Sequence, residues 1–401
     1  MNDVLLKQNP LWGGDNKPEG VRRDILKFLI PAIDVRHIVA ISGSRRSGKS
    51  YLFRQLQHHL ISLGVERENI LEINFEDPYF IHRKEDEKLL GDFYSAYQIL
   101  KNPQGRKYLF FDEIQNIKGW QHWVREIYDR EEEVKIFITG SNAELLSIEL
   151  SSHLTGRVLS FENFPFSFAE LLKAKNEEYF IADSMKEIIS KNFNKKERLF
   201  HHLEGSFSKG FFPEICVIDN LDLSQEILRQ YFSNVIFKDI VPRFSIRNAK
   251  VIEELSYYLS TNFTTMINTG GLAKIVGSNE NTIKEYLNYL EKAYLFFSVP
   301  HFEYSMKKQI RREKKVYIND VGLRTATAFQ FSPDAGRNIE NIVFNHLRRQ
   351  VAQVYYWKSK DQKEIDFVIQ NKGKKIGLNV CYSDELPERE FLGFSDAIKA
   401  K

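Results

Sequence analysis

The feature that most constrains this chain is an octapeptide with two glycines and a lysine, Gly43-Ser44-Arg45-Arg46-Ser47-Gly48-Lys49-Ser50. It fits the pattern G-x-x-x-x-G-K-[ST] of a phosphate-binding loop, or P-loop. The apolar run at 37–41 predicts a buried strand before the loop, and the spaced apolar residues of 51–63 predict an amphipathic helix after it. A strand, a glycine loop and a helix N-terminus in this order present backbone N–H groups to an anion. The sequence therefore predicts a nucleotide site.

Each residue type in the loop has an expected task. A lysine at this position reaches the β- and γ-phosphates, and the hydroxyl that follows it binds Mg²⁺. We therefore expect Lys49 on the phosphates and Ser50 on the metal. The residues expected to contact the nucleotide are Gly43, Ser44, Arg45, Arg46, Ser47, Gly48, Lys49, Ser50 and Tyr51.

A second segment, at 107–113, supplies paired carboxylates. Four hydrophobic residues precede Asp112 and Glu113, as in a central parallel strand whose C-terminal end points into a ligand crevice. Asp112 is expected to support the Mg²⁺ and Glu113 to polarise the attacking water. The alternative is a strand that ends in a solvated Asp-Glu turn. The position downstream of the P-loop favours the catalytic interpretation.

Polar residues after the next two strands are further candidates. The predicted strand at 134–139 ends at Ser141 and Asn142, which can hydrogen-bond the γ-phosphate or the water, or can equally cap a helix at 143–146. Arg157 precedes the strand-like segment 158–161. It is a candidate arginine finger, acting in cis or in trans, or else a partner of a surface carboxylate. Both alternatives stay open here.

Composition limits the class of protein. A chain of 401 residues should hold two or three domains, and 42% hydrophobic with 28% charged residues is typical of a globular protein. The net charge of +3 does not indicate nucleic-acid binding by the whole molecule. Cys216 and Cys381 form neither a disulfide framework nor a zinc pattern. With no signal segment and no membrane-spanning apolar run, we expect a cytoplasmic protein without a membrane partner.

Recognisable motifs are spread over most of the chain: residues 43–50, Phe-Phe-Asp-Glu-Ile-Gln at 110–115, Ile-Thr-Gly-Ser-Asn at 138–142, Leu-Thr-Gly-Arg at 154–157, Phe-Pro-Phe-Ser-Phe-Ala-Glu-Leu-Leu at 164–172, Gly-Phe-Phe-Pro-Glu-Ile at 210–215, Val-Tyr-Ile-Asn-Asp-Val-Gly-Leu at 316–323 and Glu-Ile-Asp-Phe-Val-Ile at 364–369. Together they resemble one prokaryotic family of AAA-type P-loop ATPases, in which a restriction-endonuclease-like domain of uncharacterised function follows the ATPase domain. The resemblance implies ATP as the nucleotide. It also implies an α/β fold with a parallel sheet of the additional-strand type, in which one strand separates the P-loop strand from the strand that ends in Asp112.

We divide the chain into a P-loop domain at 1–165, a helical connector with a winged-helix region at 166–303, and a small nuclease-like α/β domain at 304–401. Residues 272–293 have helix-turn-helix form, and 294–299 would be the wing strand. The second helix is a candidate DNA reader, but it carries glutamates beside its lysines, so a winged helix used for protein contacts is an equal alternative. A basic run at 307–315 could bind DNA phosphates or could be a solvated hairpin; it comprises Lys307, Lys308, Arg311, Arg312, Lys314 and Lys315.

Nuclease chemistry is not expected of the C-terminal domain. A metal-dependent nuclease needs a helix carboxylate, a strand Asp and a following Glu-x-Lys. Glu340 and Asp366 match the first two, but Asn379 and Cys381 stand where Glu and Lys are required. Asn lacks the charge to hold a divalent metal well, and Cys cannot replace an ammonium group.

The sequence thus predicts Mg²⁺-dependent hydrolysis of ATP to ADP and phosphate, driving a conformational change, with DNA as a candidate target. The alternative is a slow nucleotide-gated switch or scaffold that recruits a protein partner and has no nucleic-acid role. The oligomeric state is open, and a trans role for Arg157 would require a ring or a dimer.

Overall fold

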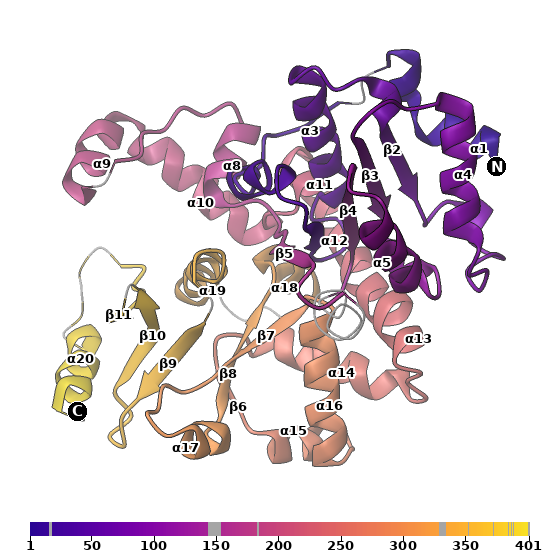
Figure 1. Ribbon diagram of the computed structural model, residues 1–401. Coiled ribbons are helices and arrows are strands. Elements are labelled where there is room, and N and C mark those ends of the chain that lie inside the picture. The colour runs from indigo at the N-terminus through magenta and orange to yellow at the C-terminus, as the bar shows by residue number, and fades with distance from the viewer. Residues whose placement is uncertain are drawn as a thin grey trace. The chain divides into compact units, whose positions relative to one another are not determined.

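The computed structural model describes residues 1–15, 18–142, 154–182, 184–328, 334–351, 353–371, 373–383, 385, 387 and 389–399. They belong to two compact units, Met1–Phe166 and Ser167–Lys401 (Figure 1).

Unit 1 is built on a parallel sheet of five strands. They are β1 (Ile38–Ser42), β2 (Ile70–Asn74), β3 (Lys107–Asp112), β4 (Val134–Gly140) and β5 (Val158–Glu162). Their order across the sheet is β2-β3-β4-β1-β5, and each neighbouring pair is parallel. Because β4 lies between β1 and β3, the additional-strand arrangement is confirmed. This order brings the C-terminal ends of β1, β3 and β4 to adjacent positions on one edge of the sheet.

Helices cover both faces of this sheet (Figure 1). One apolar core contains residues of α1 (Asn2–Gln8), α4 (Leu89–Lys101) and α5 (Trp120–Arg130), and the other contains residues of α2 (Leu26–Leu29) and α3 (Lys49–Ser62). Along β3, Leu109 and Phe111 join the first core, whereas Tyr108 and Phe110 join the second. This alternation follows from the two-residue period of a strand. Short 3₁₀ turns connect the elements: η1 (Pro10–Gly13), η2 (Pro31–Ile33), η3 (Arg67–Asn69), η4 (Pro78–Phe80) and η5 (Ile114–Asn116).

The first part of unit 2 is helical. Its elements are α8 (Phe168–Ala174), α9 (Met185–Asn192), η6 (Phe193–Lys195), α10 (Lys196–Lys209), α11 (Pro213–Cys216), α12 (Leu221–Asn234), the π-helix η7 (Val235–Ile240), α13 (Val241–Arg243) and α14 (Ala249–Thr261). Helices α12 and α14 share an apolar core with the elements that follow them. Within the described ranges, no helix has both the length and the apolar character that crossing a membrane requires.

A two-helix segment with a small antiparallel sheet comes next. It consists of β6 (Met266–Ile267), α15 (Thr269–Ile275), α16 (Glu280–Lys292), β7 (Phe296–Val299), α17 (Met306–Arg311) and β8 (Lys314–Ile318). The sheet order is β6-β8-β7. The helix pair and the strand expected at 272–299 are therefore present. The domain boundary predicted at 303 needs correction, because it separates β8 from both strands with which it pairs.

The C-terminal part of unit 2 contains α18 (Val321–Thr327), α19 (Ala335–Arg348), β9 (Val354–Lys358), β10 (Glu364–Asn371), β11 (Lys374–Leu378) and α20 (Arg389–Lys399). Its antiparallel sheet has the order β11-β10-β9. The strand predicted at 375–383 ends earlier, at Leu378. Beyond Leu378, side-chain hydrogen bonds take over from the backbone pairing with β10. Asn379 Oδ1 accepts the backbone N–H of Asp366 at 3.1 Å, and Asp366 Oδ2 accepts the backbone N–H of Val380 at 2.8 Å.

Two motifs that carry the family resemblance meet at the buried side chain of Asp320. Its carboxylate accepts backbone N–H groups from Phe211 at 2.7 Å and from Gly322 at 2.8 Å. Gly210 has a φ of +70°, and a Cβ there would lie 1.7 Å from Asp320 Oδ1. These residues therefore join the helical region to the start of α18, and their role is structural.

Candidate nucleotide-binding site

The P-loop joins the end of β1 to the start of α3. Gly48 is the N-cap of α3 and has a φ of +94°. Because glycine has no side chain, the N-terminus of α3 receives no side-chain cap, which suits a helix end that binds an anion. Gly43 lies so close to the segment that follows β5 that a Cβ would be 2.0 Å from the Asn163 carbonyl oxygen. Both glycines are therefore required by the loop's path.

Two buried side chains from distant segments hold this loop at Ser47. Asn163 Nδ2 donates to the Ser47 carbonyl at 3.0 Å and to its hydroxyl at 3.1 Å. The Arg23 guanidinium donates to the same carbonyl at 2.8 Å and to the Phe164 carbonyl at 2.6 Å. Neither Arg23 nor Asn163 was identified from the sequence, because neither belongs to the local motif.

Lys49 lies inside the loop and is only 5% exposed. Its ammonium group donates to the carbonyls of Gly43 at 3.1 Å and Ser44 at 3.3 Å. It also lies 3.2 Å from Glu113 Oε1, at the end of β3. The residue expected to bind phosphates and the one expected to polarise water are therefore in direct contact.

Asp112 faces Ser50 across the gap between β3 and α3. The Ser50 hydroxyl donates to Asp112 Oδ2 at 2.6 Å, and the Thr139 hydroxyl donates to Asp112 Oδ1. The two expected metal ligands, Ser50 and Asp112, are thus neighbours. Burial, together with the charge of Glu113, raises the pKa of Asp112 to about 6, although these hydrogen bonds and Lys49 oppose the rise.

Glu113 has a left-handed backbone, with a φ of +54°. Its backbone N–H donates to Thr139 Oγ1 at 3.0 Å. Its carboxylate accepts from Gln115 Nε2 at 2.6 Å and from the Ser141 backbone N–H at 3.1 Å. Burial alone would raise the pKa of Glu113, but Lys49, the Gln115 hydrogen bond and Arg45 outweigh it and lower the pKa. The carboxylate is therefore ionised and is positioned by three groups, the Lys49 ammonium, the Gln115 amide and the Ser141 backbone N–H.

The remaining loop candidates lie farther from these carboxylates or act through the backbone. Arg45 pairs with Glu76 at 2.6 Å, Arg46 supplies a left-handed turn with a φ of +67°, and Tyr51 is 46% exposed. Asn142 is buried beside Ser141. The alternative role of both residues as a cap for a helix at 143–146 lies outside the described residues.

Arg157 lies at the opposite edge of the sheet. Its carbonyl accepts the backbone N–H of Ile38 at 2.8 Å, where β1 begins, and its side chain pairs with Asp129 at 3.2 Å. The P-loop follows the far end of β1, about 15 Å away for a strand of five residues. A cis role for Arg157 is incompatible with this position, and a trans role stays a prediction.

Comparisons with known proteins give matches along most of the chain. A family described as an AAA domain matches residues 35–172, and two domains of unknown function match 201–334 and 335–401. An uncharacterized protein of Methanocaldococcus jannaschii is 34% identical over 397 residues, covering 96% of this chain and 82% of the relative. An uncharacterized protein of Haemophilus influenzae is 31% identical, covering 92% and 87%. The chain belongs to their family. We refer to it as the AAA-domain family, after its N-terminal domain.

Among solved structures, the AAA-domain family member is similar to the Aeropyrum pernix Orc1 protein in complex with DNA, with a TM-score of 0.34 and 14% identity, covering 80% of this chain and 96% of that one. It is also similar to AMPPCP-bound DnaA from Aquifex aeolicus, with a TM-score of 0.32 and 12% identity, covering 70% and 90%.

Thr139 is a site residue of the AAA domain that was not predicted from the sequence. It is buried on β4 and bonds both Asp112 and the backbone of Glu113. We predict that Thr139→Val, which keeps the shape but removes the hydroxyl, lowers the free energy of unfolding by about 1–3 kcal/mol, because a buried N–H loses its acceptor. Urea unfolding measures this. Thr139→Ser, which retains the hydroxyl, is the control, and equal losses in both variants would contradict the role of the hydroxyl.

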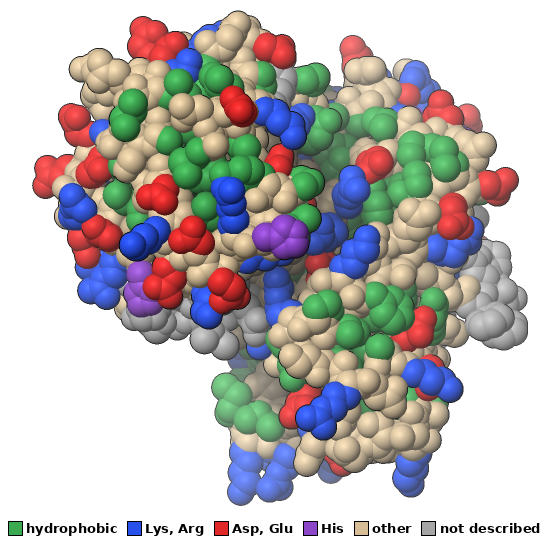
Figure 2. All heavy atoms as spheres, turned by 90° about the vertical axis from the view of Figure 1, so that its right-hand side faces the viewer, with side chains coloured by type: hydrophobic (Ala, Val, Ile, Leu, Met, Phe, Trp, Pro, Cys, Tyr) green, Lys and Arg blue, Asp and Glu red, His purple; other side chains and the backbone are tan. Residues whose placement is uncertain are grey.

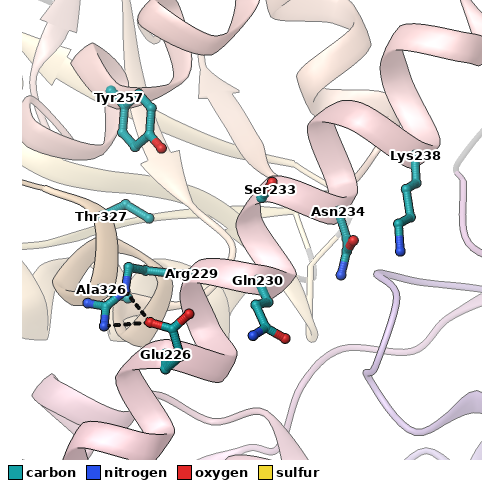
Figure 3. A pocket seen from close by; sticks show the side chains of 9 residues that line it. All are labelled: Glu226, Arg229, Gln230, Ser233, Asn234, Lys238, Tyr257, Ala326 and Thr327. Carbon is teal, nitrogen blue, oxygen red and sulfur yellow. Dashed lines mark hydrogen bonds and ion pairs between the residues drawn. The ribbon is translucent and has the colours of Figure 1, made fainter.

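Unit 2 of this AAA-domain family member also contains a hollow of about 600 Å³ along α12 (Figure 3). One helical stretch supplies four of its lining side chains, Gln230, Ser233, Asn234 and Lys238, and Tyr257 lies across from them. Its lining carboxylate, Glu226, pairs with Arg229 at 2.9 Å. This polar surface offers no ionisable pair comparable with Asp112 and Glu113, so the candidate site is the P-loop.

Proposed function

We propose that this protein binds ATP with Mg²⁺ at the P-loop of unit 1 and hydrolyses it to ADP and phosphate. The observation that carries the proposal is the convergence of two sequence segments, one with Lys49 and Ser50 and the other with Asp112 and Glu113. Thr139, from a third segment, bonds the Asp112 carboxylate and the backbone N–H of Glu113. The AAA-domain match over 35–172 supports the same class of activity.

The loop fits a triphosphate. The N-terminus of α3 has no side-chain cap, and the close path at Gly43 leaves no room for a side chain. Backbone N–H groups and the Lys49 ammonium are the donors that an anionic phosphate chain requires. The phosphates would therefore be held by the loop backbone and Lys49.

The donor set at Ser50 and Asp112 fits Mg²⁺. A hydroxyl and a carboxylate oxygen 2.6 Å apart are the hard oxygen ligands that this ion prefers. When bound, the ion supplies charge neutralisation for the phosphate oxygens. Thr139 fixes the second oxygen of Asp112, so the carboxylate keeps one orientation.

Glu113 would orient the attacking water. The water oxygen forms a bond to the γ-phosphorus while the bond to the β–γ bridging oxygen breaks, and the proton of the water passes to the carboxylate or to the phosphate. An ionised Glu113 is suited to this task, and its hydrogen bonds from Gln115 and Ser141 hold it in place.

The contact between Lys49 and Glu113 suggests how nucleotide binding changes the site. Lys49 pairs with Glu113 at 3.2 Å. Phosphates that attract the Lys49 ammonium compete with this pair, so binding would release Glu113 toward the water. This competition is the conformational step that we associate with nucleotide binding.

The raised pKa of Asp112 predicts a pH dependence. With a pKa of about 6 instead of its ordinary 3.8, Asp112 loses its negative charge as the pH falls through 6. Because a protonated carboxyl cannot bind Mg²⁺, we expect Mg²⁺-dependent ATP affinity to fall by about fourfold between pH 7.5 and 5.5. Isothermal titration measures the affinity. In Asp112→Asn, the affinity should not fall over this pH range. If the variant showed the same fall in affinity as the wild type, Asp112 would not be the titrating metal ligand.

DNA is the candidate target. The order β6-α15-α16-β7-α17-β8, with sheet order β6-β8-β7, supports the winged-helix interpretation of residues 266–318. Figure 2 shows Lys and Arg side chains interspersed with Asp and Glu side chains on the face that it draws. However, Lys284 on α16 pairs with Glu280 at 2.7 Å, which reduces its attraction for phosphates.

The basic run at 307–315 is shorter than predicted. Lys315 is 4% exposed and faces carboxylates, because successive residues of β8 point to opposite faces. It cannot contact DNA phosphates. The exposed members are Lys307, Lys308, Arg311, Arg312 and Lys314.

The second candidate function is a slow nucleotide-gated switch that recruits a protein partner. The two functions need the same phosphate site, so ATP turnover is measured against single-stranded and duplex DNA at two salt concentrations. Stimulation that weakens at high salt supports a DNA-acting ATPase. Turnover indifferent to DNA supports the switch, and no nucleotide binding at all overturns both.

A further inference from the structure

A buried ammonium group in unit 2 is surrounded by three carboxylates. Lys315, on β8, has its Nζ 3.0 Å from Glu340 Oε1 and 3.6 Å from Asp366 Oδ1, and it also pairs with Glu364 Oε1. Glu340 comes from α19, whereas Glu364 and Asp366 lie two residues apart on β10. We call these four residues the Lys315 cluster.

The cluster is short of positive charge at its centre. Three carboxylates meet one ammonium group, whose three N–H donors can face one carboxylate each. Tyr317, two residues along β8, adds a neutral hydrogen bond to Glu340 Oε1 at 2.7 Å. Lys358 lies 3.9 Å from Glu364, at the margin of the cluster.

Electrostatics keep Lys315 charged. Burial opposes the charge, but Glu340, Glu364 and Asp366 outweigh it and raise the pKa of Lys315 above its ordinary value. Burial raises the pKa of Glu340, and Lys315 opposes that rise. The stability of each charge therefore depends on the others, and removal of Lys315 would leave three half-buried carboxylates without the cation between them.

The cluster lies in the wall of an open hollow of about 710 Å³, whose lining also includes Thr265, Asn379 and Cys381. Ions from solvent can therefore reach it. Carboxylate oxygens from a helix and a strand are the ligand type that Mg²⁺ and Mn²⁺ prefer. As the described part of the protein is arranged, no three His, Cys, Asp or Glu side chains are placed to hold a metal ion.

We propose that Lys315 is the built-in cation of this cluster: it occupies the position that a divalent metal would take and makes the C-terminal part of unit 2 independent of metal. Because β8 pairs with β6 and β7, while the carboxylates belong to α19 and β10, the same contact joins two parts of unit 2. Asn379 and Cys381 stand where a nuclease would have Glu and Lys, and Lys315 would take the place of the metal that those residues help to hold.

The test is the metal response of Lys315→Met in the full chain without nucleotide, measured as melting temperature. We expect the variant to melt about 10 °C below the wild type, since three half-buried carboxylates lose the cation between them. Mn²⁺ should restore at least half of that loss. Lys314→Met removes the same charge from the exposed neighbour and is the matched control; it should melt like the wild type and gain nothing beyond the wild-type response. A Lys315→Met variant that ignores Mn²⁺ would overturn the proposal.

A second variant keeps the proposal testable if Lys315→Met does not fold. Glu364→Gln leaves Lys315 in place, so its response to Mn²⁺ should equal that of the wild type. A wild-type Mn²⁺ response that Glu364→Gln abolishes would show a metal in the cluster beside Lys315 and would overturn the proposal. Mg²⁺-dependent DNA cleavage that disappears in Asp366→Ala would overturn it in the same way.

Discussion

Lys49→Ala is expected to weaken ATP binding by about 100-fold or more. The buried ammonium is the cation inside the loop, and charge-assisted hydrogen bonds to phosphate contribute roughly 1.5–3 kcal/mol each. Its loss also leaves Glu113 without the cation that lies 3.2 Å away, which adds repulsion toward the phosphates. Equilibrium titration with a fluorescent ATP analogue measures the change.

The control for this variant is Lys118→Ala. Lys118 is exposed, pairs with Glu85 at 2.7 Å and lies outside the loop, so its removal should leave ATP affinity unchanged. Melting temperatures of both variants distinguish lost binding from lost folding. Tight ATP binding by folded Lys49→Ala would contradict the phosphate role of Lys49.

Glu113→Gln is expected to keep ATP binding and to lose turnover by about 10²–10⁴-fold, the range associated with a positioned general base. The amide retains the shape of the side chain and can still accept the hydrogen bonds from Gln115 and Ser141. It cannot take a proton, and it no longer pairs with Lys49. Steady-state phosphate release and ATP affinity are measured on the same preparation.

Glu126→Gln is the matched control for Glu113→Gln. Glu126 is an exposed carboxylate of α5, paired with Arg130 at 2.6 Å, so the same chemical change there should leave turnover intact. If Glu113→Gln instead lost ATP binding in parallel with turnover, Glu113 would be a binding residue and the water-orienting role would be wrong.

Much of unit 1 could be predicted from local patterns. The apolar runs at 107–111 and 134–139 give β3 and β4, because strands buried on both faces appear as continuous hydrophobic segments. The position of Ser50 opposite Asp112 follows from the strand order implied by the family resemblance. These features depend on short segments with strong signals.

The supporting side chains could not be predicted in the same way. Arg23, Thr139 and Asn163 act across the sheet or across long loops, and an isolated Arg, Thr or Asn in a sequence carries no signal of its partner. The position of Arg157, by contrast, could have been predicted from the sequence. Arg157 precedes a strand that runs parallel to β1, whereas the P-loop follows β1, so the two lie at opposite ends of the strands. Lys315 was misread because a run of basic residues resembles a solvated surface even where a strand turns one member inward.

The most direct test of the central claim is a single-turnover measurement with enzyme in excess over γ-labelled ATP and Mg²⁺. The wild type should convert all bound ATP to ADP and labelled phosphate, while Glu113→Gln should hold the ATP intact and Lys49→Ala should bind none. Equal rates of phosphate release in the wild type and Glu113→Gln, or intact ATP held indefinitely by the wild type, would contradict hydrolysis at this site.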